Sequence, residues 1–349
     1  MVYLHKYVSC NKQQAQEHLF SAKEISMAVV NKQPETFERA RKAVVIGCGF
    51  VGSTCAFALM ESGVFSEIAL VDAHANKAEG EALDIAHGTP FYGPVEVYAG
   101  SYADLNTADI CIITAGSAQK PGESRLDLVA RNVAILRSIL HDINQTSFDG
   151  ILILVSNPVD ILTYVAARET GLPAHRVFGT GTILDSARFK SILSSYLDID
   201  PRNVHARIIG EHGDSEFAVW SMANVSGIPL MECFKNKNIN NPSQLMTDIE
   251  ERVRKSAGII IEKKGATYYG IAASVRRLCE AIMRDEKAVM TVSTMLDGEY
   301  GLSDVALSIV SVMGINGIEE HLPAPISEEE LAKLRASAQT LKDVIAQVS

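Results

Sequence analysis

Short apolar runs alternate with amphipathic stretches along the chain from residue 43 onward. Four of the apolar runs are rich in β-branched residues: Ala43–Cys48, Glu67–Val71, Ile110–Thr114 and Gly150–Val155. Runs of this length are typical of strands covered on both faces, as in a parallel sheet. Between them lie stretches with helical spacing, of which Leu128–Ile143 is the clearest. The order strand, helix, strand, helix predicts a doubly wound α/β sheet.

The pattern changes in the second half of the chain. Val204–Ile209 predicts one strand and Val219–Val225 another, after which we expect long helices to dominate. The last helix follows a capping box at Ser327–Glu330. We therefore expect an α+β domain over residues 166–349, after a first domain over residues 43–165.

Residues 1–42 are polar and mixed in charge, and they precede the first strong strand signal. Two interpretations stay open for this extension. In the first, the extension is an arm that either packs on a neighbour or frays. In the second, translation begins later, at Met27.

Composition limits the kind of partner that the protein can have. Of its 349 residues 47% are hydrophobic and 21% are charged, which is typical of a globular protein. The net charge of −10 and the pI near 5.4 argue against nucleic acid or an anionic membrane as a partner. The uncharged stretch 43–60 contains three glycines, so we do not expect it to span a membrane. Any anionic ligand therefore needs a local cluster of cations.

Six scattered cysteines form no CxxC pair. We therefore expect no metal site, no disulfide framework, and reduced thiols in a cytoplasmic protein.

A glycine motif follows the first predicted strand. Gly47–Gly52 fits G-x-G-x-x-G and is followed by a small-residue helix, the arrangement that lets a diphosphate approach the helix N-terminus. Asp72 ends the next strand, twenty residues after Gly52, where a carboxylate accepts hydrogen bonds from ribose hydroxyls and repels a 2′-phosphate. The sequence therefore favours NAD over NADP as the cofactor.

Four clusters of polar residues lie in apolar or loop surroundings: Asp185–Arg188, Ile209–Asp214, Ser117–Arg125 and Val155–Pro158. Asp and Arg three positions apart share one helix face. His212, which lies close to glycines at a strand end, is a candidate acid or base. Taken alone, each cluster also has an ordinary interpretation as an ion pair, a structural histidine, a solvated loop or a turn.

Together these motifs resemble the lactate/malate dehydrogenase family. The resemblance runs from about Arg41 to the C-terminus and rests on GCGFVG, LVD, AQKPGESRLDLVARN, VSNPVD, GTILDSARF, IIGEHGD and KGATYYG, in that order. It implies a Rossmann NAD-binding domain followed by an α+β catalytic domain. The implied reaction is reversible hydride transfer between NADH and pyruvate, giving (S)-lactate. Two alternatives remain: a malate or branched 2-hydroxy acid dehydrogenase, and a cofactor-binding protein without turnover.

The resemblance also implies catalytic roles. His212 would donate the proton in pyruvate reduction, and Asp185 would hold its other ring nitrogen and raise its pKa. Arg188 would grip the substrate carboxylate with a two-point fork. Arg125 would polarise the carbonyl group, and closure of its loop would exclude water.

Further family positions bear on the substrate and the cofactor. Asn157 would bond the substrate oxygen, and Thr267 would lie beside the methyl group. Gln119 stands where the family uses arginine to bind malate; glutamine would leave a second carboxylate unpaired, which favours pyruvate and lactate. The positions that match the cofactor groove of the family are Gly47, Gly49, Val51, Gly52, Asp72, Lys77, Tyr102, Gly116, Ser117, Ser138, Val155 and Asn157.

The family also suggests regulation and assembly. Bacterial members often respond to fructose 1,6-bisphosphate through an arginine and a histidine, whose counterparts here are Lys190 and His205. Lysine keeps the charge and loses the two-point fork, so we expect a weaker effector site. The family further implies a homotetramer.

Overall fold

The computed structural model describes residues 41–118, 122 and 124–348. The predicted extension, residues 1–42, lies outside the described residues except at its last two positions. Gln119 also lies outside them.

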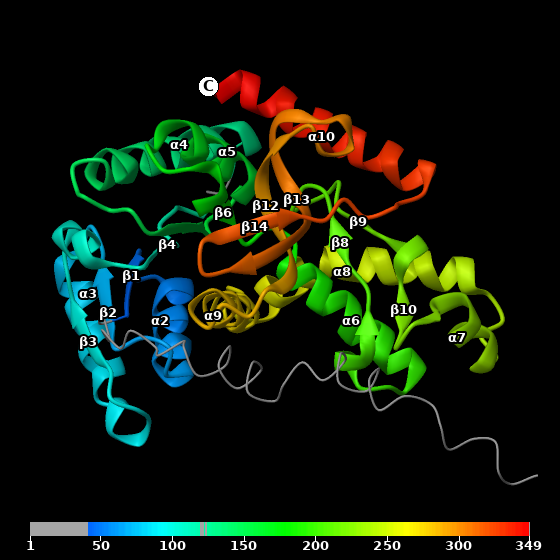
Figure 1. Cartoon of the computed structure of the whole chain (residues 1–349), viewed down its shortest axis with the longest axis horizontal. Helices are drawn as coiled ribbons and strands as arrows, with labels where there is room; N and C mark the ends of the chain where they lie inside the picture. Colours follow the sequence, from blue (N-terminus) through cyan, green and yellow to red (C-terminus); the bar gives the residue numbers. More distant parts are fainter. Residues whose placement is uncertain (1–40, 119–121, 123, 349) are drawn as a thin grey trace, which may run out of the picture. The chain divides into compact units, whose positions relative to one another are not determined.

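A nine-stranded sheet forms the centre of the described chain, in the order β14-β13-β12-β6-β5-β4-β1-β2-β3 (Figure 1). Six of these strands pair in parallel, and the order reverses between β1 and β4, as in a doubly wound sheet. The predicted Rossmann arrangement is confirmed. The six strands are β1 (Lys42–Ile46), β2 (Glu67–Val71), β3 (Glu96–Ala99), β4 (Ile110–Ile113), β5 (Ile151–Leu154) and β6 (Val177–Gly179).

Helices cover both faces of this sheet, which explains the uninterrupted apolar strands. In β1, Val44 and Ile46 join one buried cluster, while Ala43 and Val45 join the other. The first cluster includes side chains of α4 (Arg125–Ile143), α5 (Val159–Glu169) and α10 (Glu328–Val348). The second includes side chains of α2 (Phe50–Ser62), α3 (Ala75–Ala86) and α9 (Tyr269–Met283).

A third apolar cluster lies under α6 (Ile183–Leu197), α7 (Leu230–Asn236) and α8 (Pro242–Lys264). Short strands border it: β7 (Val204–His205), β8 (Ile208–Ile209), β9 (Phe217–Ala218), β10 (Asn224–Val225) and β11 (Ile228–Pro229). The 3-10 helices are η1 (Thr89–Phe91), η2 (Tyr102–Thr107), η3 (Ala174–Arg176), η4 (Pro201–Asn203), η5 (Trp220–Met222) and η6 (Glu299–Gly301).

Two single strands predicted in the second half are wrong in their extent. Val204–Ile209 divides into β7 and β8, which pair with different partners. Val219–Val225 contains the 3-10 helix η5 and only ends in a strand, β10. Apolar content alone does not show where a chain leaves one sheet and enters another.

The expectation that long helices dominate after Val225 is confirmed by α7, α8, α9 and α10, but it leaves out three strands of the same region. Three antiparallel strands extend the main sheet: β12 (Ala288–Asp297), β13 (Ser303–Gly314) and β14 (Gly317–His321). Their sequences contain serines and threonines that are nevertheless buried, such as Ser293 and Ser308. These hydroxyl groups interrupt the apolar pattern by which buried strands are recognised.

None of the helices in the described part of the chain is both long enough and apolar enough to cross a membrane.

Candidate active site

The glycine loop lies at the carboxyl end of β1, beside the point where the strand order reverses. Gly47 has a φ of +101°, and a Cβ atom there would lie 2.5 Å from the Ala115 backbone nitrogen. At Gly52 a Cβ atom would lie 1.8 Å from the carbonyl oxygen of Gly47. Both positions therefore need glycine for the fold, because the loop, the helix and β4 approach one another closely.

Gly49 differs from these two glycines. A Cβ atom built on it meets no described heavy atom within 4 Å, so glycine there opens space instead of relieving a clash. Gly49 is the N-cap of α2, whose first turn carries no acidic residue and no side-chain cap. Helix N-terminal amides attract phosphate groups. The loop thus fits the diphosphate of a dinucleotide.

Asp72 follows β2 and is held toward the same loop. Its carboxylate accepts hydrogen bonds from the backbone nitrogens of Cys48 at 2.7 Å and His74 at 2.9 Å. Partial burial works to raise the pKa of Asp72, but these amide bonds outweigh it and lower the pKa. Asp72 is therefore an anion fixed beside the glycine loop, as ribose recognition requires.

The other sequence-predicted cofactor positions are distributed around these two features. Val51 is half-buried in α2, Lys77 is exposed on α3, and Ser138 is exposed on α4. Tyr102 is half-buried in η2 and packs against the core, where burial raises the pKa of its hydroxyl group to about 12. Val155 is buried after β5.

A buried amide joins the two loops that follow β4 and β5. Asn132 Oδ1 accepts a hydrogen bond from the Ser117 backbone nitrogen at 2.9 Å. Its Nδ2 donates to the carbonyl oxygens of Ser117 and Asn157. Asn157 itself is exposed, and Gly116 lies against the side chain of Ser156. Asn132 thus fixes the stems of two predicted site loops, a role that the sequence analysis missed.

Asp185 and His212 are far apart in sequence but meet in the structure. Asp185 lies in the first turn of α6, and His212 lies in the turn between β8 and β9. The Oδ2 atom of Asp185 is 2.6 Å from Nδ1 of His212, and its Oδ1 atom accepts a hydrogen bond from Arg188 Nη1 at 2.7 Å. The structure thus brings together three residues predicted from separate motifs.

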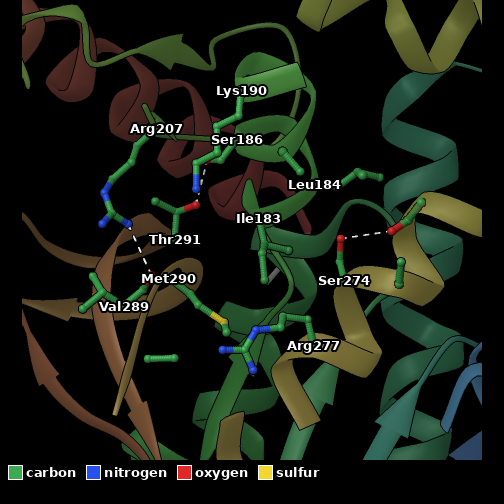
Figure 2. A pocket seen from close by; sticks show the side chains of 14 residues that line it. Ile183, Leu184, Ser186, Lys190, Arg207, Ser274, Arg277, Val289, Met290 and Thr291 are labelled. Atoms are coloured by element: carbon green, nitrogen blue, oxygen red, sulfur yellow. Dashed lines mark hydrogen bonds between the residues drawn. The ribbon is translucent and has the colours of Figure 1, made fainter. Parts of the chain in front are cut away.

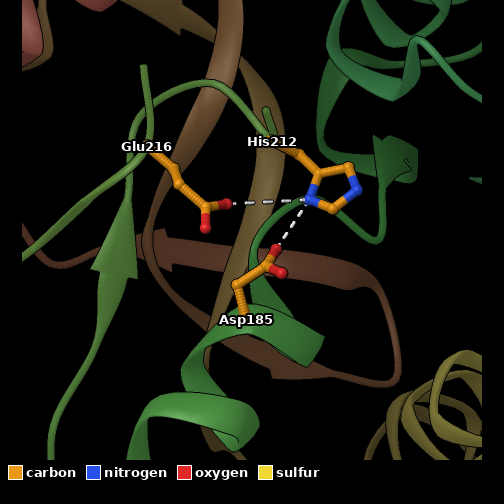
Figure 3. Close-up of side chains that lie close together, drawn as sticks. All are labelled: Asp185, His212 and Glu216. Atoms are coloured by element: carbon orange, nitrogen blue, oxygen red, sulfur yellow. Dashed lines mark hydrogen bonds and ion pairs between the residues drawn. The ribbon is translucent and has the colours of Figure 1, made fainter. Parts of the chain in front are cut away.

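This ion pair shifts the pKa of both partners. Burial works to lower the pKa of His212, but the charge and the hydrogen bond of Asp185 outweigh it and raise the pKa to about 9. Burial likewise works to raise the pKa of Asp185, and His212 and Arg188 lower it. At neutral pH the pair is therefore an imidazolium and a carboxylate, with the Nε2 atom of the ring facing away from Asp185 (Figure 3).

Two more carboxyl groups surround His212, and neither was predicted. Asp160, buried at the start of α5, accepts a hydrogen bond from the His212 backbone nitrogen at 2.7 Å. Glu216 Oε2 lies 3.9 Å from Nδ1 of the ring. Asp160 belongs to the VSNPVD motif, so the sequence did contain a signal for this residue. Glu216 offered none, because β9, which it precedes, was not predicted.

Two more predicted substrate residues, Thr267 and Arg125, lie at the beginnings of helices. Thr267 is half-buried just before α9. Arg125 is the first residue of α4, which begins with a capping box formed by Ser124 and Asp127, and its side chain lies outside what the structure describes.

Asp185, His212 and Glu216 also raise the question of a metal ion, because their ligand atoms lie within 4.8 Å of one another. The 2.6 Å between Asp185 and His212 is a hydrogen-bond distance and leaves no room for an ion between those two atoms.

The two predicted effector residues, Lys190 and His205, lie on α6 and on β7. Lys190 lines a cavity of about 580 Å³ together with Arg207 and Arg277, as Figure 2 shows. Burial and the neighbouring charge of Arg207 lower the pKa of Lys190. His205 is exposed on β7 and is not among the described residues that line the cavity.

Comparison with known proteins agrees with this geometry. Residues 41–179 match the model of the lactate/malate dehydrogenase NAD-binding domain, and residues 182–349 match that of the alpha/beta C-terminal domain. The L-lactate dehydrogenase of Thermoanaerobacterium saccharolyticum is 51% identical over 88% of this chain and 99% of its own length. That of Acetivibrio thermocellus is 51% identical over 87% of this chain and 96% of its own.

Solved structures show the same likeness. The minor L-lactate dehydrogenase of Enterococcus mundtii superposes with a TM-score of 0.86 at 43% identity, covering 89% of this chain and 99% of that one. A lactate dehydrogenase from a deep-sea metagenome library gives the same TM-score at 39% identity, over 89% of this chain and 99% of its own. The glycine loop, the Asp185–His212 pair and these matches over nearly nine-tenths of the chain lead to one conclusion: the chain belongs to the lactate/malate dehydrogenase family.

Proposed function

We propose that this protein is an NAD-dependent L-lactate dehydrogenase, which interconverts pyruvate and (S)-lactate. The observation that carries the proposal is the pair of buried Asp185 and half-buried His212, 2.6 Å apart, with Arg188 bonded to the same carboxylate. Relatives that match over most of the chain are named L-lactate dehydrogenases.

In this reaction pyruvate, NADH and one proton become lactate and NAD. NADH, when bound, supplies the hydride that reaches the carbonyl carbon. His212 donates its Nε2 proton to the carbonyl oxygen, and the Nδ1 proton stays in the bond to Asp185. Asp185 thereby fixes the tautomer and stabilises the imidazolium before the transfer. In lactate oxidation the neutral ring takes the proton back.

Arg188 binds the substrate carboxylate in this proposal. Its guanidinium group has five donors, and the bond to Asp185 engages Nη1. Arg125 polarises the carbonyl group, Asn157 bonds the substrate oxygen, and Thr267 lies beside the methyl group. These roles come from the family likeness, as do those of the cofactor positions around Gly49 and Asp72.

Gln119 sets the choice of substrate in this proposal, because a neutral amide offers no partner to a second carboxylate. The test is a panel of initial rates with NADH and equal concentrations of pyruvate, oxaloacetate and 2-ketoisocaproate. We expect pyruvate to react fastest. Faster oxaloacetate reduction would assign a malate dehydrogenase, and faster 2-ketoisocaproate reduction a branched 2-hydroxy acid dehydrogenase.

An anionic effector is the second part of the proposal. Lys190, Arg207 and Arg277 gather cations around one cavity in an acidic protein, and an anion would relieve the repulsion between them. We name fructose 1,6-bisphosphate from the family likeness. Repeating the pyruvate assay with and without this sugar bisphosphate tests it, and the result expected is a lower KM for pyruvate.

We also propose a cytoplasmic homotetramer, with a domain division at residue 165. Cys48, Cys55, Cys111, Cys233 and Cys279 are all free thiols, which suits a reducing compartment. Large apolar side chains that would suit a subunit interface are exposed on the single chain, including those of Phe50 and Tyr269. Light scattering measures the subunit number directly.

A further inference from the structure

The ring of His212 faces two carboxyl groups through the same nitrogen atom. Asp185 Oδ2 lies 2.6 Å from Nδ1 and Glu216 Oε2 lies 3.9 Å from it, on different sides of the ring nitrogen (Figure 3). The family likeness assigns a role to Asp185 and none to Glu216. We propose that Glu216 is a positioning residue for His212. Its carboxyl group, the second one beside the ring, extends reduction of the substrate to more alkaline pH. This inference rests on the proposed dehydrogenase function.

The backbone fixes Glu216 in this place. Strands β8 and β9 form an antiparallel pair in which Ile209 faces Phe217, so the connecting turn carries His212 back over Glu216. The Glu216 nitrogen donates to the Gly213 carbonyl oxygen, which closes the turn. The next two residues of β9 are buried in the apolar core, and Glu216 itself is only 5% exposed. The turn and the buried strand that follows it thus place the Glu216 side chain beside the ring of His212.

Burial gives this carboxyl group an unusual titration. Burial and the neighbouring charge of Asp185 together raise the pKa of Glu216 to about 8, although the charge of His212 works in the opposite direction. At pH 7 the group is mostly neutral, and above pH 8 it becomes an anion. Its negative charge then appears in the pH range in which the imidazolium begins to lose its proton. An anion beside the ring favours the protonated form, so His212 stays a proton donor to higher pH.

Other charged groups face the pair and set its background. Arg188 on α6 and Arg254 on α8 act on Glu216 and oppose the rise in its pKa. Asp160 on α5 bonds the His212 backbone nitrogen, and its own pKa is raised to about 6 by burial. Because Asp160 is mostly ionised at neutral pH, its charge stays constant over the alkaline range. Glu216 is the group whose charge changes there.

The test compares Glu216→Gln with the wild-type enzyme over pH 6 to 10. Two quantities are measured: kcat/KM for pyruvate, and the titration of the His212 ring by NMR in the enzyme without substrate. Glutamine keeps the shape and the hydrogen-bonding oxygen but has no charge. We expect the alkaline limb of kcat/KM and the ring titration both to move down by about one pH unit, with activity at pH 6.5 within about threefold of wild type.

Two further variants make the result specific. Glu216→Asp draws the carboxyl group back by one methylene, and we expect a smaller shift in the same direction. Glu250→Gln is the matched control, because Glu250 also interacts with Arg254 but bonds the Trp220 ring and not His212. It should leave the pH profile unchanged. If Glu216→Gln does not fold, Glu216→Asp carries the comparison.

The role of Glu216 is refuted if the alkaline limb of kcat/KM and the ring titration of His212 both stay within about 0.2 pH units of wild type. It is also refuted if activity falls equally at every pH. The second pattern would indicate a merely structural carboxyl group. Absence of turnover by the wild-type enzyme with every 2-keto acid would instead refute the proposed function. In that case the ring titration alone still decides whether Glu216 raises the pKa of His212.

Discussion

Asp185 and His212, twenty-seven residues apart in sequence, form a partly buried hydrogen bond of 2.6 Å between Oδ2 and Nδ1. The side chain of Asp185 is 2% exposed, so its charge has little solvent to stabilise it and depends on His212 and Arg188. Replacing one partner of such an ion pair strongly destabilises the folded protein, because the other charge stays buried and unpaired.

The first prediction follows from this bond. Asp185→Asn should lower kcat for pyruvate reduction at least about a hundredfold, because the amide no longer stabilises the imidazolium and allows the wrong tautomer. NADH affinity, measured by fluorescence titration, should change little. Asp149→Asn, which removes an exposed partner of Arg176, is the control and should retain full activity. Normal turnover in Asp185→Asn would exclude Asp185 from the proton transfer.

The second prediction concerns pH in the wild-type enzyme. Reduction needs protonated His212, whose pKa is raised to about 9, so kcat/KM for pyruvate should hold through neutrality and fall as pH rises through about 9. Lactate oxidation needs the neutral ring and should rise over the same range. Rate profiles in both directions measure this. A reduction limb near pH 6.5, the ordinary histidine value, would show that Asp185 does not raise the pKa in solution.

The third prediction separates two glycines of one motif. Gly52→Ala places a Cβ atom 1.8 Å from the Gly47 carbonyl oxygen, so we expect a loss of more than about 2 kcal/mol in the free energy of unfolding. At Gly49 the added Cβ atom of alanine meets open space, so Gly49→Ala should lower the free energy of unfolding by less than about 1 kcal/mol. The same atom would occupy space that the diphosphate needs. The NADH affinity of this variant should fall about tenfold or more. Denaturant unfolding and NADH titration measure the pair, and unchanged NADH affinity in Gly49→Ala would contradict the proposed contact.

The fourth prediction tests the buried amide of Asn132. Asn132→Ala leaves backbone groups of Ser117 and Asn157 without their partner, which should cost about 2 kcal/mol in stability and raise KM for pyruvate about tenfold. Asn144→Ala at the C-cap of the same helix removes an exposed bond to Glu169 and should leave KM unchanged. Equal KM values in the two variants would mean that Asn132 stabilises the fold without positioning the site loops.

Several parts of the fold could be predicted because one local signal specified each of them. The strands β1, β2, β4 and β5 are continuous apolar runs, and the glycine motif falls where the sheet order reverses. The strands β12 and β13 could not be found in this way. Their buried hydroxyl groups bond partners from distant segments, as Ser308 Oγ does in accepting a hydrogen bond from the Thr182 nitrogen. Such partners are invisible to a pattern read along one stretch of chain.

The same difference applies to the candidate site. Asp185, Arg188 and His212 stand in motifs that are specific to the family, and the structure brings them within hydrogen-bond distance. Glu216 and Asn132 act through the tertiary arrangement alone. A glutamate four residues after a histidine does not by itself indicate a contact. The β8–β9 pair brings the two side chains together.

The most direct test of the account is the single-turnover rate of NADH oxidation by pyruvate in the wild-type protein and in His212→Ala. We predict rapid turnover in the wild-type protein and a rate at least about a hundredfold lower in the variant, with the NADH dissociation constant within about threefold. A His212→Ala rate within about tenfold of wild type would contradict the assignment of His212 as the proton donor.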